Sequence, residues 1–322
     1  MAVAVNEATH KAYFVNHNSS SVTVINGKTG AVIGTAKTGA GPEGIGVNPA
    51  TNRVYVANAG DRSVTVIDGT TDTVVATVRT GSYPQAVVVN PTTNRIYVAN
   101  NSGHNVTVID GATNETTNVR VGQGPRAIAL NPVTNKIYTA NYGSRDITEI
   151  DGVTNNATFI DTGKHPWALA VDSRANRIYV ANEGSASLSI VDGATRAVRN
   201  VAVGEIPFAV AVNPVTGRAY ALTYAGSTMA VIDGATASVI RTVPLPERPS
   251  AIGVNARTDQ IYIANQRASS VLVLDGKTDA VIATVNTGSI PYALAIDTAA
   301  NQAYVANFNS DSATVVDVPA RQ

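Results

Sequence analysis

A strand-like segment that ends in Tyr-x-x-Asn or a close variant recurs eight times along this chain of 322 residues. Successive copies lie 41 or 42 residues apart, measured between the tyrosines Tyr13, Tyr55, Tyr97, Tyr138, Tyr179, Tyr220, Tyr262 and Tyr304. Each period holds short runs of β-branched residues separated by Gly, Pro, Asn and Asp. A repeat of this length that is built from short strands predicts a β-propeller in which one repeat forms one blade.

The aligned repeat predicts four antiparallel strands per blade, which we call a, b, c and d in chain order. Repeats start near residues 2, 44, 86, 127, 168, 209, 251 and 293. The chain supplies eight a, b and c strands but only seven d strands, because it opens on an a strand and stops just after a c strand. We therefore predict an all-β fold: one propeller domain over residues 1–322, with eight four-stranded blades of which the last has only three strands.

Residues that recur in every blade are expected to serve the fold. Small residues in strand a, such as Gly44 and Gly46, suit the crowded inner end of a blade. The Asn-Pro-x-Thr-Asn motif predicts a tight turn between strands a and b, and Asp-Gly, as in Asp68-Gly69, predicts a positive-φ turn between c and d. We interpret the recurring Asp as a turn residue, and the Asn after strand b as a loop residue that bonds the backbone; neither is read as a ligand.

The strands that read Tyr-Val-Ala-Asn resemble the YVTN-repeat β-propeller family of surface-layer and periplasmic proteins; they are Tyr55–Asn58, Tyr97–Asn100, Tyr179–Asn182 and Tyr304–Asn307. The resemblance covers essentially the whole chain. Members of that family commonly have seven blades, so seven is the alternative count. The resemblance implies no particular activity, because a fold does not fix a function.

The composition indicates which partners and which cellular compartment to expect. Lys plus Arg equals Asp plus Glu at 23 each, so no net field attracts nucleic acid, and we expect none as a partner. No apolar stretch approaches the ~20 residues that span a bilayer, and no signal peptide precedes the first strand. The absence of cysteine is compatible with export, so we expect a periplasmic or extracellular monomer.

A unique site should lie where the repeats differ. In a propeller the d-to-a and b-to-c connections share one face around the mouth of the central channel, where such folds usually place ligands. Two positions per blade report on that face: the residue after the Pro that precedes strand a, and the residue after the Asn that ends strand b. The first set reads Glu43, Gln85, Arg126, Trp167, Phe208, Ser250 and Tyr292; the second reads His17, Ala59, Asn101, Tyr142, Glu183, Tyr224, Gln266 and Phe308.

Aromatic residues concentrate at these fifteen positions, which hold six of the nine that are not repeat tyrosines. Large rings at a concave mouth are typical of a pocket for an organic molecule or a sugar. The predicted ligand-binding residues are Trp167, Phe208, Tyr224, Glu183, Tyr292, Phe308, His17 and Tyr83. The alternative is that these rings bind no ligand and only cap the channel or pack on one another.

The sequence does not decide whether the predicted site catalyses a reaction. A hydrolase or lyase needs a base beside an acid or an oxyanion stabiliser, and the candidates are His165, Glu43, Arg126 and Tyr142. No Gly-x-Ser-x-Gly elbow, phosphate loop or dense metal-ligand cluster accompanies them, so we predict no metal and no cofactor. A metal site formed by the carboxylates of Glu43 and Glu183 together with Asn101 is a weaker alternative.

Three functions are compatible with these residues. The first is binding of a small organic ligand at the channel mouth, with hydrolase or lyase activity as an extension. The second is a cell-surface or periplasmic scaffold whose aromatic rim contacts a protein or a glycan. The third is a propeller that holds a cofactor, which would need His17 or His165 as an axial ligand.

Overall fold

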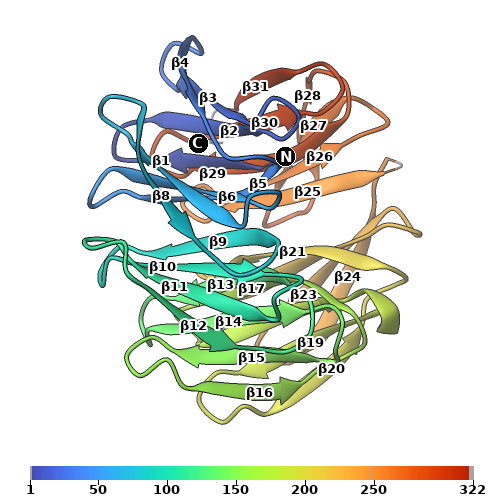
Figure 1. Ribbon diagram of the computed structural model, residues 1–322. Helices are drawn as coiled ribbons and strands as arrows, with labels where there is room; N and C mark the ends of the chain where they lie inside the picture. Colours follow the sequence, from blue (N-terminus) through green and yellow to red (C-terminus); the bar gives the residue numbers. More distant parts are fainter. Residues whose placement is uncertain (1, 247, 319–322) are drawn as a thin grey trace. The chain divides into compact units, whose positions relative to one another are not determined.

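The computed structural model describes residues 2–246 and 248–318, which form eight antiparallel sheets in chain order (Figure 1). Seven sheets have four strands and the last has three. The chain is thus an eight-bladed β-propeller, as the repeat count predicts, and the seven-bladed alternative is wrong. The strand ranges also match the prediction, since the first strand is of type a and the last is of type c.

The first four sheets comprise β1(Val3–Asn6), β2(Lys11–Asn16), β3(Ser21–Asn26) and β4(Val32–Lys37); β5(Pro42–Asn48), β6(Arg53–Asn58), β7(Ser63–Asp68) and β8(Thr73–Arg79); β9(Pro84–Asn90), β10(Arg95–Asn100), β11(Asn105–Asp110) and β12(Thr116–Arg120); β13(Pro125–Asn131), β14(Lys136–Asn141), β15(Asp146–Asp151) and β16(Ala157–Asp161). The last four comprise β17(Pro166–Asp172), β18(Arg177–Asn182), β19(Ser187–Asp192) and β20(Val198–Ala202); β21(Pro207–Asn213), β22(Arg218–Thr223), β23(Thr228–Asp233) and β24(Ser238–Pro244); β25(Pro249–Asn255), β26(Gln260–Asn265), β27(Ser270–Asp275) and β28(Val281–Asn286); β29(Pro291–Asp297), β30(Gln302–Asn307) and β31(Ser312–Asp317).

Strands that are consecutive in sequence pair within each sheet, so every blade is a meander. A single turn of 3-10 helix, η1(Glu183–Ser185), is the one helical segment among the described residues. No helix in this part of the chain is long and apolar enough to cross a membrane.

Two compact units divide the chain. Unit 1 comprises residues 1–139 and 148–159, and unit 2 comprises residues 140–147 and 160–322. We describe each unit by itself below, and the single domain over residues 1–322 stays a prediction.

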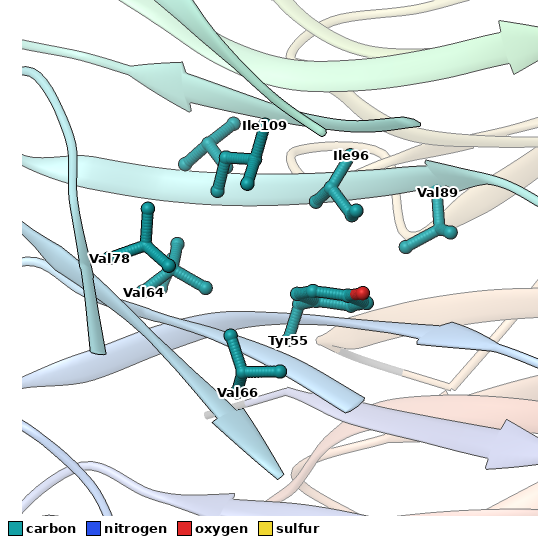
Figure 2. Close-up of a cluster of buried hydrophobic side chains, with 9 residues drawn as sticks. Tyr55, Val64, Val66, Val78, Val89, Ile96 and Ile109 are labelled. Carbon is teal, nitrogen blue, oxygen red and sulfur yellow. The ribbon is translucent and has the colours of Figure 1, made fainter. Parts of the chain in front are cut away.

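The core consists of apolar layers between neighbouring sheets. In unit 1, Tyr55 on β6 and Val64 and Val66 on β7 face Val89 and Ile96 of the next sheet (Figure 2). In unit 2, Tyr220 packs in the same way among residues such as Ile261 and Ile263. All eight repeat tyrosines have no exposed surface. Since burying one large apolar side chain contributes about 1.5–3 kcal/mol, these layers account for why the repeat keeps its apolar positions.

The small residues of strand a are required by the next blade. A Cβ on Gly44 would lie 2.5 Å from the Gln85 carbonyl oxygen, and one on Gly46 would lie 3.0 Å from Val87 Cγ1. On Gly253 in unit 2, a Cβ would lie 2.5 Å from Leu294 Cδ1. Neighbouring inner strands therefore approach too closely for larger side chains, which confirms the sequence interpretation.

The turn between strands a and b is built by its asparagines. In the second blade the Asn48 Oδ1 accepts hydrogen bonds from the N–H groups of Ala50 and Thr51, and Asn52 adopts a φ of 51°. The Asn48 side chain also donates to Asn94 Oδ1 of the next blade at 2.8 Å. This bond between blades recurs as Asn6–Asn52, Asn90–Asn135, Asn213–Asp259 and Asn255–Asn301. The motif thus closes a turn and joins two blades.

The turn between strands c and d has a positive φ as predicted, but not at its glycine. Gly69, Gly111 and Gly193 do not adopt a positive φ; the left-handed residue of this turn comes later, for example Asp72 with a φ of 57°. Glycine is needed here for space, because a Cβ on Gly69 would collide with Asn52 Oδ1. The Asp itself is a turn residue as predicted, since Asp68 Oδ1 accepts hydrogen bonds from the Thr70 and Thr71 N–H groups.

The asparagine that ends strand b is a fold residue, but most copies bond side chains, not the backbone as predicted. Asn58 is fully buried and donates to the Ser63 and Thr65 hydroxyls of strand c at 3.0 and 2.9 Å. The sixth copy, Thr223, instead lies 2.7 Å from the Thr228 hydroxyl. A buried amide needs such partners, which explains the Ser-x-Thr pattern of strand c.

Candidate functional site

The d-to-a connection and the b-to-c loop of one blade are joined by a main-chain hydrogen bond. The residue two positions before the predicted site residue of strand a accepts it, and the residue after the Asn of strand b donates it. Examples are Glu183 N to His165 O at 3.0 Å, Tyr224 N to Ile206 O at 3.0 Å, and Gln266 N to Arg248 O at 2.9 Å. The two sequence positions chosen above therefore lie at one end of each blade, which we call the loop end.

The residue at this position is left-handed in all seven d-to-a connections. The set is Gly41, Tyr83, Gly124, His165, Ile206, Arg248 and Ile290, with φ between 51° and 62°. Five of them are not glycine, and a β-branched residue such as Ile206 is rare in this region of φ and ψ. Large side chains are thus held at the loop end against a local backbone preference, which is common at binding sites.

Sequence reasoning missed Ile206 and Ile290 at this position. The available signal was the alignment itself, since Gly41 and Gly124 occupy the same place in two repeats. Glycine in some copies indicates a positive φ in all of them.

Four side chains of unit 2 form the candidate site, which we call the Tyr142 cluster: Tyr142, His165, Trp167 and Glu183. Tyr142 follows the last residue of β14, and its ring stacks on His165 with centroids 5.0 Å apart and an interplanar angle of 29°. It meets Trp167, the second residue of β17, edge to face at 5.4 Å and 79°. Such aromatic pairs contribute about 0.5–1.5 kcal/mol beyond area burial, so the rings hold one another in a defined arrangement.

Glu183 adds a carboxylate next to these rings. Its N–H donates to the His165 carbonyl, and a Cβ on the following Gly184 would lie 2.8 Å from His165 Nδ1. The η1 turn therefore packs directly on the imidazole. The Glu183 Oε2 is buried, and no described residue donates a hydrogen bond to it. A buried carboxylate oxygen normally has a donor, which this one lacks among the described residues.

Two further ring pairs stand on later blades of unit 2. Phe208 and Tyr224 meet edge to face with centroids 6.2 Å apart, and Tyr292 and Phe308 meet at 6.2 Å with a tilt of 43°. Tyr224, Tyr292 and Phe308 remain about half exposed, at 46%, 47% and 46%. These rings pack on one another, as expected if they serve no ligand, yet they leave a large apolar surface in solvent.

In unit 1 the structure brings Glu43, Tyr83 and Arg126 together. The Tyr83 hydroxyl donates to Glu43 Oε1 at 2.7 Å. This hydrogen bond, followed by partial burial and the negative charge of Glu43, raises the pKa of Tyr83, and the positive charge of Arg126 opposes the shift. Glu43 therefore accepts a hydrogen bond from Tyr83, a partner that the sequence did not predict for it.

The two histidines of unit 1 at the loop end make main-chain contacts. His17 Nδ1 lies 3.1 Å from the Pro42 carbonyl oxygen, so this nitrogen donates the hydrogen bond. His104 Nδ1 accepts from the Gly124 N–H at 3.1 Å. Both rings therefore have one nitrogen committed to the loop backbone.

The four predicted catalytic residues fall in different units. Tyr142 and His165 stack on each other in unit 2, whereas Glu43 and Arg126 both lie near Tyr83 in unit 1. Their catalytic roles stay predictions. Among residues 2–246 and 248–318, no group of three or more His, Asp or Glu side chains is placed to hold a metal ion.

These features define the chain as an eight-bladed β-propeller with aromatic and charged side chains gathered at the loop ends of its blades. The family described as "YNCE-like beta-propeller" matches residues 14–213, which is more than half of the chain. The chain belongs to this family, and the YVTN-type resemblance is consistent with it.

Solved propellers share the fold at low sequence identity. Hydrazine synthase of Kuenenia stuttgartiensis matches with a TM-score of 0.70 and 17% identity over 99% of this chain and 96% of that one. The dihydro-heme d1 dehydrogenase NirN, solved in complex with DHE, matches with a TM-score of 0.74 and 14% identity over 98% of this chain and 75% of that one. No curated protein matched the sequence. At such identities the likeness shows the fold alone.

Proposed function

We propose that this protein binds a small organic molecule at the Tyr142 cluster. The observation that carries the proposal is the contact of Tyr142 with both His165 and Trp167, beside a buried oxygen of Glu183 that has no donor among the described residues. Rings with one convergent polar group are the usual lining of a small-molecule site.

The cluster favours a ligand with an apolar or aromatic body and a hydrogen-bond donor. The faces and edges of Tyr142 and Trp167 supply apolar contact, and Glu183 Oε2 can accept from a hydroxyl or an amine. A protonated amine would gain twice, because the carboxylate and the aromatic faces both attract a cation. We therefore expect aromatic or aliphatic amines to bind more tightly than acids of the same shape.

A hydrolase or lyase reaction is an extension of this proposal. His165 is the candidate base and Tyr142 the candidate acid, since their rings are stacked at 5.0 Å. An extracytoplasmic location is part of the proposal too, supported by the family match and by the cysteine-free sequence.

Trp167 provides the test, because it is the only tryptophan of the chain. We expect its fluorescence to change saturably when phenethylamine, tyramine or hexylamine is titrated, with a parallel rise in melting temperature. Stabilisation approaches ~2.7 kcal/mol when the ligand reaches a hundred times its dissociation constant. Any amine that binds is then incubated at length and analysed for turnover.

Two variants locate the binding. Tyr142→Ala and Glu183→Gln should each weaken amine binding at least tenfold, while Phe159→Ala should not, because Phe159 is an exposed ring on the outer strand β16. Wild-type affinity in Tyr142→Ala would place the binding site elsewhere and reject the proposal.

An interaction scaffold is the second candidate, and the half-exposed rings of Tyr224, Tyr292 and Phe308 favour it. Exposed apolar patches of this kind mark protein or glycan contacts. The two functions separate in a glycan array or a pull-down: the triple variant Tyr224→Ser, Tyr292→Ser, Phe308→Ser should lose a macromolecular partner and keep amine binding.

A further inference from the structure

A pocket of about 170 Å³ lies between the fifth and sixth blades, in unit 2, at the end where the a-to-b and c-to-d turns are found, which we call the turn end. From the fifth blade it is lined by Arg177 at the start of β18, Asp192 at the end of β19 and Arg199 on β20. From the sixth it is lined by Gly234 and Ala237, in the turn between β23 and β24. Two arginines of one blade therefore share a mostly polar pocket with a turn of the next blade.

The next pair of blades carries the same two arginines. Arg218 opens strand b of the sixth blade as Arg177 opens it in the fifth, each two residues before a repeat tyrosine. Arg241 lies on strand d, like Arg199, and both are opposite the fourth residue of strand c. The interface between the sixth and seventh blades is therefore a template for the pocket.

In this template the arginines surround a carboxylate, that of Asp279. Arg241 Nε lies 3.0 Å from Asp279 Oδ2, and the Asp279 side chain is almost fully buried. Burial raises the pKa of Asp279, and the positive charges of Arg241 and Arg218 oppose the rise, so both guanidinium groups act on this carboxylate. Lys11 and Asp72 occupy the equivalent positions in unit 1, with Lys11 Nζ 2.8 Å from Asp72 Oδ2. A carboxylate in this turn is thus the partner of the cations of the preceding blade.

The pocket lacks this carboxylate, because the sixth blade has Ala237 at the position of Asp279. The backbone is the same at both positions, with a φ of 54° at Ala237 and 58° at Asp279, so only the side chain differs. Gly217 likewise replaces Asp259, a second acid whose charge acts on Asp279. Compared with the template, the pocket therefore keeps both arginines and loses two acidic side chains.

The acids that remain near the pocket are also present in the template. They are Asp192 and Asp233, and the template has Asp233 and Asp275 at the same positions. Hydrogen bonds from their own turns lower the pKa of Asp192 and of Asp233, and the charge of Arg177 adds to each shift. Neither Arg177 nor Arg199 forms an ion pair with another described residue. The positive charge that Asp279 offsets in the template is therefore not offset in the pocket.

We propose that this pocket binds a small free carboxylate in place of the missing aspartate side chain. The anion would lie against Arg177 and Arg199, and its carbon end would contact Ala237. A guanidinium presents planar, paired N–H donors that fit a carboxylate in a bidentate way. The size agrees, because a ~150 Å³ cavity accepts benzene, so acetate or propionate fits in about 170 Å³.

The test is a calorimetric titration of the full chain with sodium acetate in a buffer free of carboxylates, with sodium chloride at equal ionic strength as the blank. We expect saturable binding of acetate and no binding of acetamide, which has the same shape without the charge. Arg177→Gln and Arg199→Gln should each weaken acetate binding about tenfold, since each removes charge-assisted hydrogen bonds. Arg120→Gln is the matched control, because it removes an exposed arginine from the outer strand β12 of unit 1 and should bind acetate as the wild type does.

Changes at the two equivalent turn residues give the sharpest test. Ala237→Asp supplies the carboxylate from the chain itself, so it should abolish acetate binding and raise the melting temperature. Asp279→Ala empties the template, so acetate should restore part of the stability that this variant loses. Tyr142→Ala should bind acetate normally even though it loses amines, which separates this site from the Tyr142 cluster.

Three results would overturn the proposal: no saturable binding of acetate, equal binding of acetamide, or unchanged acetate affinity in Ala237→Asp. Tighter binding of inorganic phosphate than of acetate would overturn the carboxylate assignment.

Discussion

The two ends of each blade differ in how they are held together. At the turn end, a repeated side chain reaches the next blade: Asn48 closes its own turn and donates to Asn94. At the loop end, the bond that joins the d-to-a connection to the b-to-c loop is between main-chain groups, as from the Glu183 N–H to the His165 carbonyl. A side-chain bond restricts the residue at its position, whereas a main-chain bond leaves the side chain free to vary. The loop end can therefore change its chemistry from blade to blade without a change of fold.

The largest effect that we expect is loss of the fold in alkali, through the buried repeat tyrosines. Burial raises the pKa of Tyr179, Tyr262 and Tyr304 to about 12 each, and their acidic neighbours add to the shift. An unfolded phenol ionises near pH 10, so the folded state must keep these phenols neutral. The contribution of these tyrosines to stability should be constant below pH ~10 and should fall as the pH rises from ~10 through ~12.

Denaturant unfolding at a series of pH values, with phenolate absorbance followed in parallel, measures this loss. Tyr179→Phe should lower the steepness of the fall by at most one proton, about 1.36 kcal/mol per pH unit. Ionisation of all twelve tyrosines near pH 10 in a protein that stays folded would contradict the burial argument.

Two tyrosines four residues apart give the sharpest comparison of the two regions. Tyr220 on β22 is fully buried among the apolar residues of the next blade, and Tyr224 at the loop end is 46% exposed. We expect Tyr220→Ala to lower the free energy of unfolding by about 3–5 kcal/mol. Tyr224→Ala should lower it by only about 0.5–1.5 kcal/mol, the contribution of its edge-to-face pair with Phe208. Equal costs, measured by urea denaturation, would show that the loop-end ring also serves the fold.

The asparagine bonds between blades should have an intermediate effect. Asn255 is buried, donates to Asn301 at 2.6 Å and accepts the Arg257 N–H at 3.0 Å. Asn255→Ala should cost about 1–3 kcal/mol, because both bonds are lost. The loop-end change Asn101→Ala should cost less than about 0.5 kcal/mol. Thermal or urea unfolding of both variants would refute the assignment if their order were reversed.

The smallest effect is a gain, at a turn where the asparagine pattern is broken. Asp172 and Gly217 occupy the two positions that are hydrogen-bonded to each other in other blades, as in Asn48–Asn94 and Asn213–Asp259. The Asp172 Oδ2 is buried and has no donor among the described residues. Gly217 has a φ of 69° and space for a Cβ. Gly217→Asn should add about 0.5–1 kcal/mol, because a donor for the buried Asp172 oxygen outweighs the cost of a positive φ in a residue other than glycine.

Gly30→Asn is the matched control, since Gly30 has a φ of 70° and equal space. It should show only the cost of the positive φ, and therefore no gain. A larger gain in Gly30→Asn than in Gly217→Asn, by denaturant unfolding, would reject a bond to Asp172.

The fold could be predicted from the sequence because every blade repeats the same strand pattern and the same turn residues. The tyrosine period predicted eight blades, the count of strands predicted a three-stranded last blade, and the structure confirms both. Turn details were less accessible. Asp68-Gly69 predicted a positive-φ turn but not which residue adopts it, which is Asp72. Gly69 is required for another reason: a Cβ there would collide with Asn52, which lies seventeen residues earlier in the chain.

The site was readable only in part. Disagreement between repeats pointed to Tyr142, His165, Trp167 and Glu183, but which of them touch depends on side-chain torsions and on contacts between blades. The partner of Glu43 is Tyr83, a residue chosen for its loop and not for that pairing. Arg199 was not chosen at all, because nothing in its local sequence marks it.

The sequence by itself determined the number of blades, the order of strands and the positions where the chain is free to vary, because β-pairing and turn chemistry act over a few residues. Only the tertiary structure decided which of the variable side chains meet. Residues such as Arg199 and Ala237 are about forty positions apart, and they line one pocket because neighbouring blades bring successive repeats together. A repeat specifies its own blade by local rules, whereas a site between blades is fixed by packing between repeats.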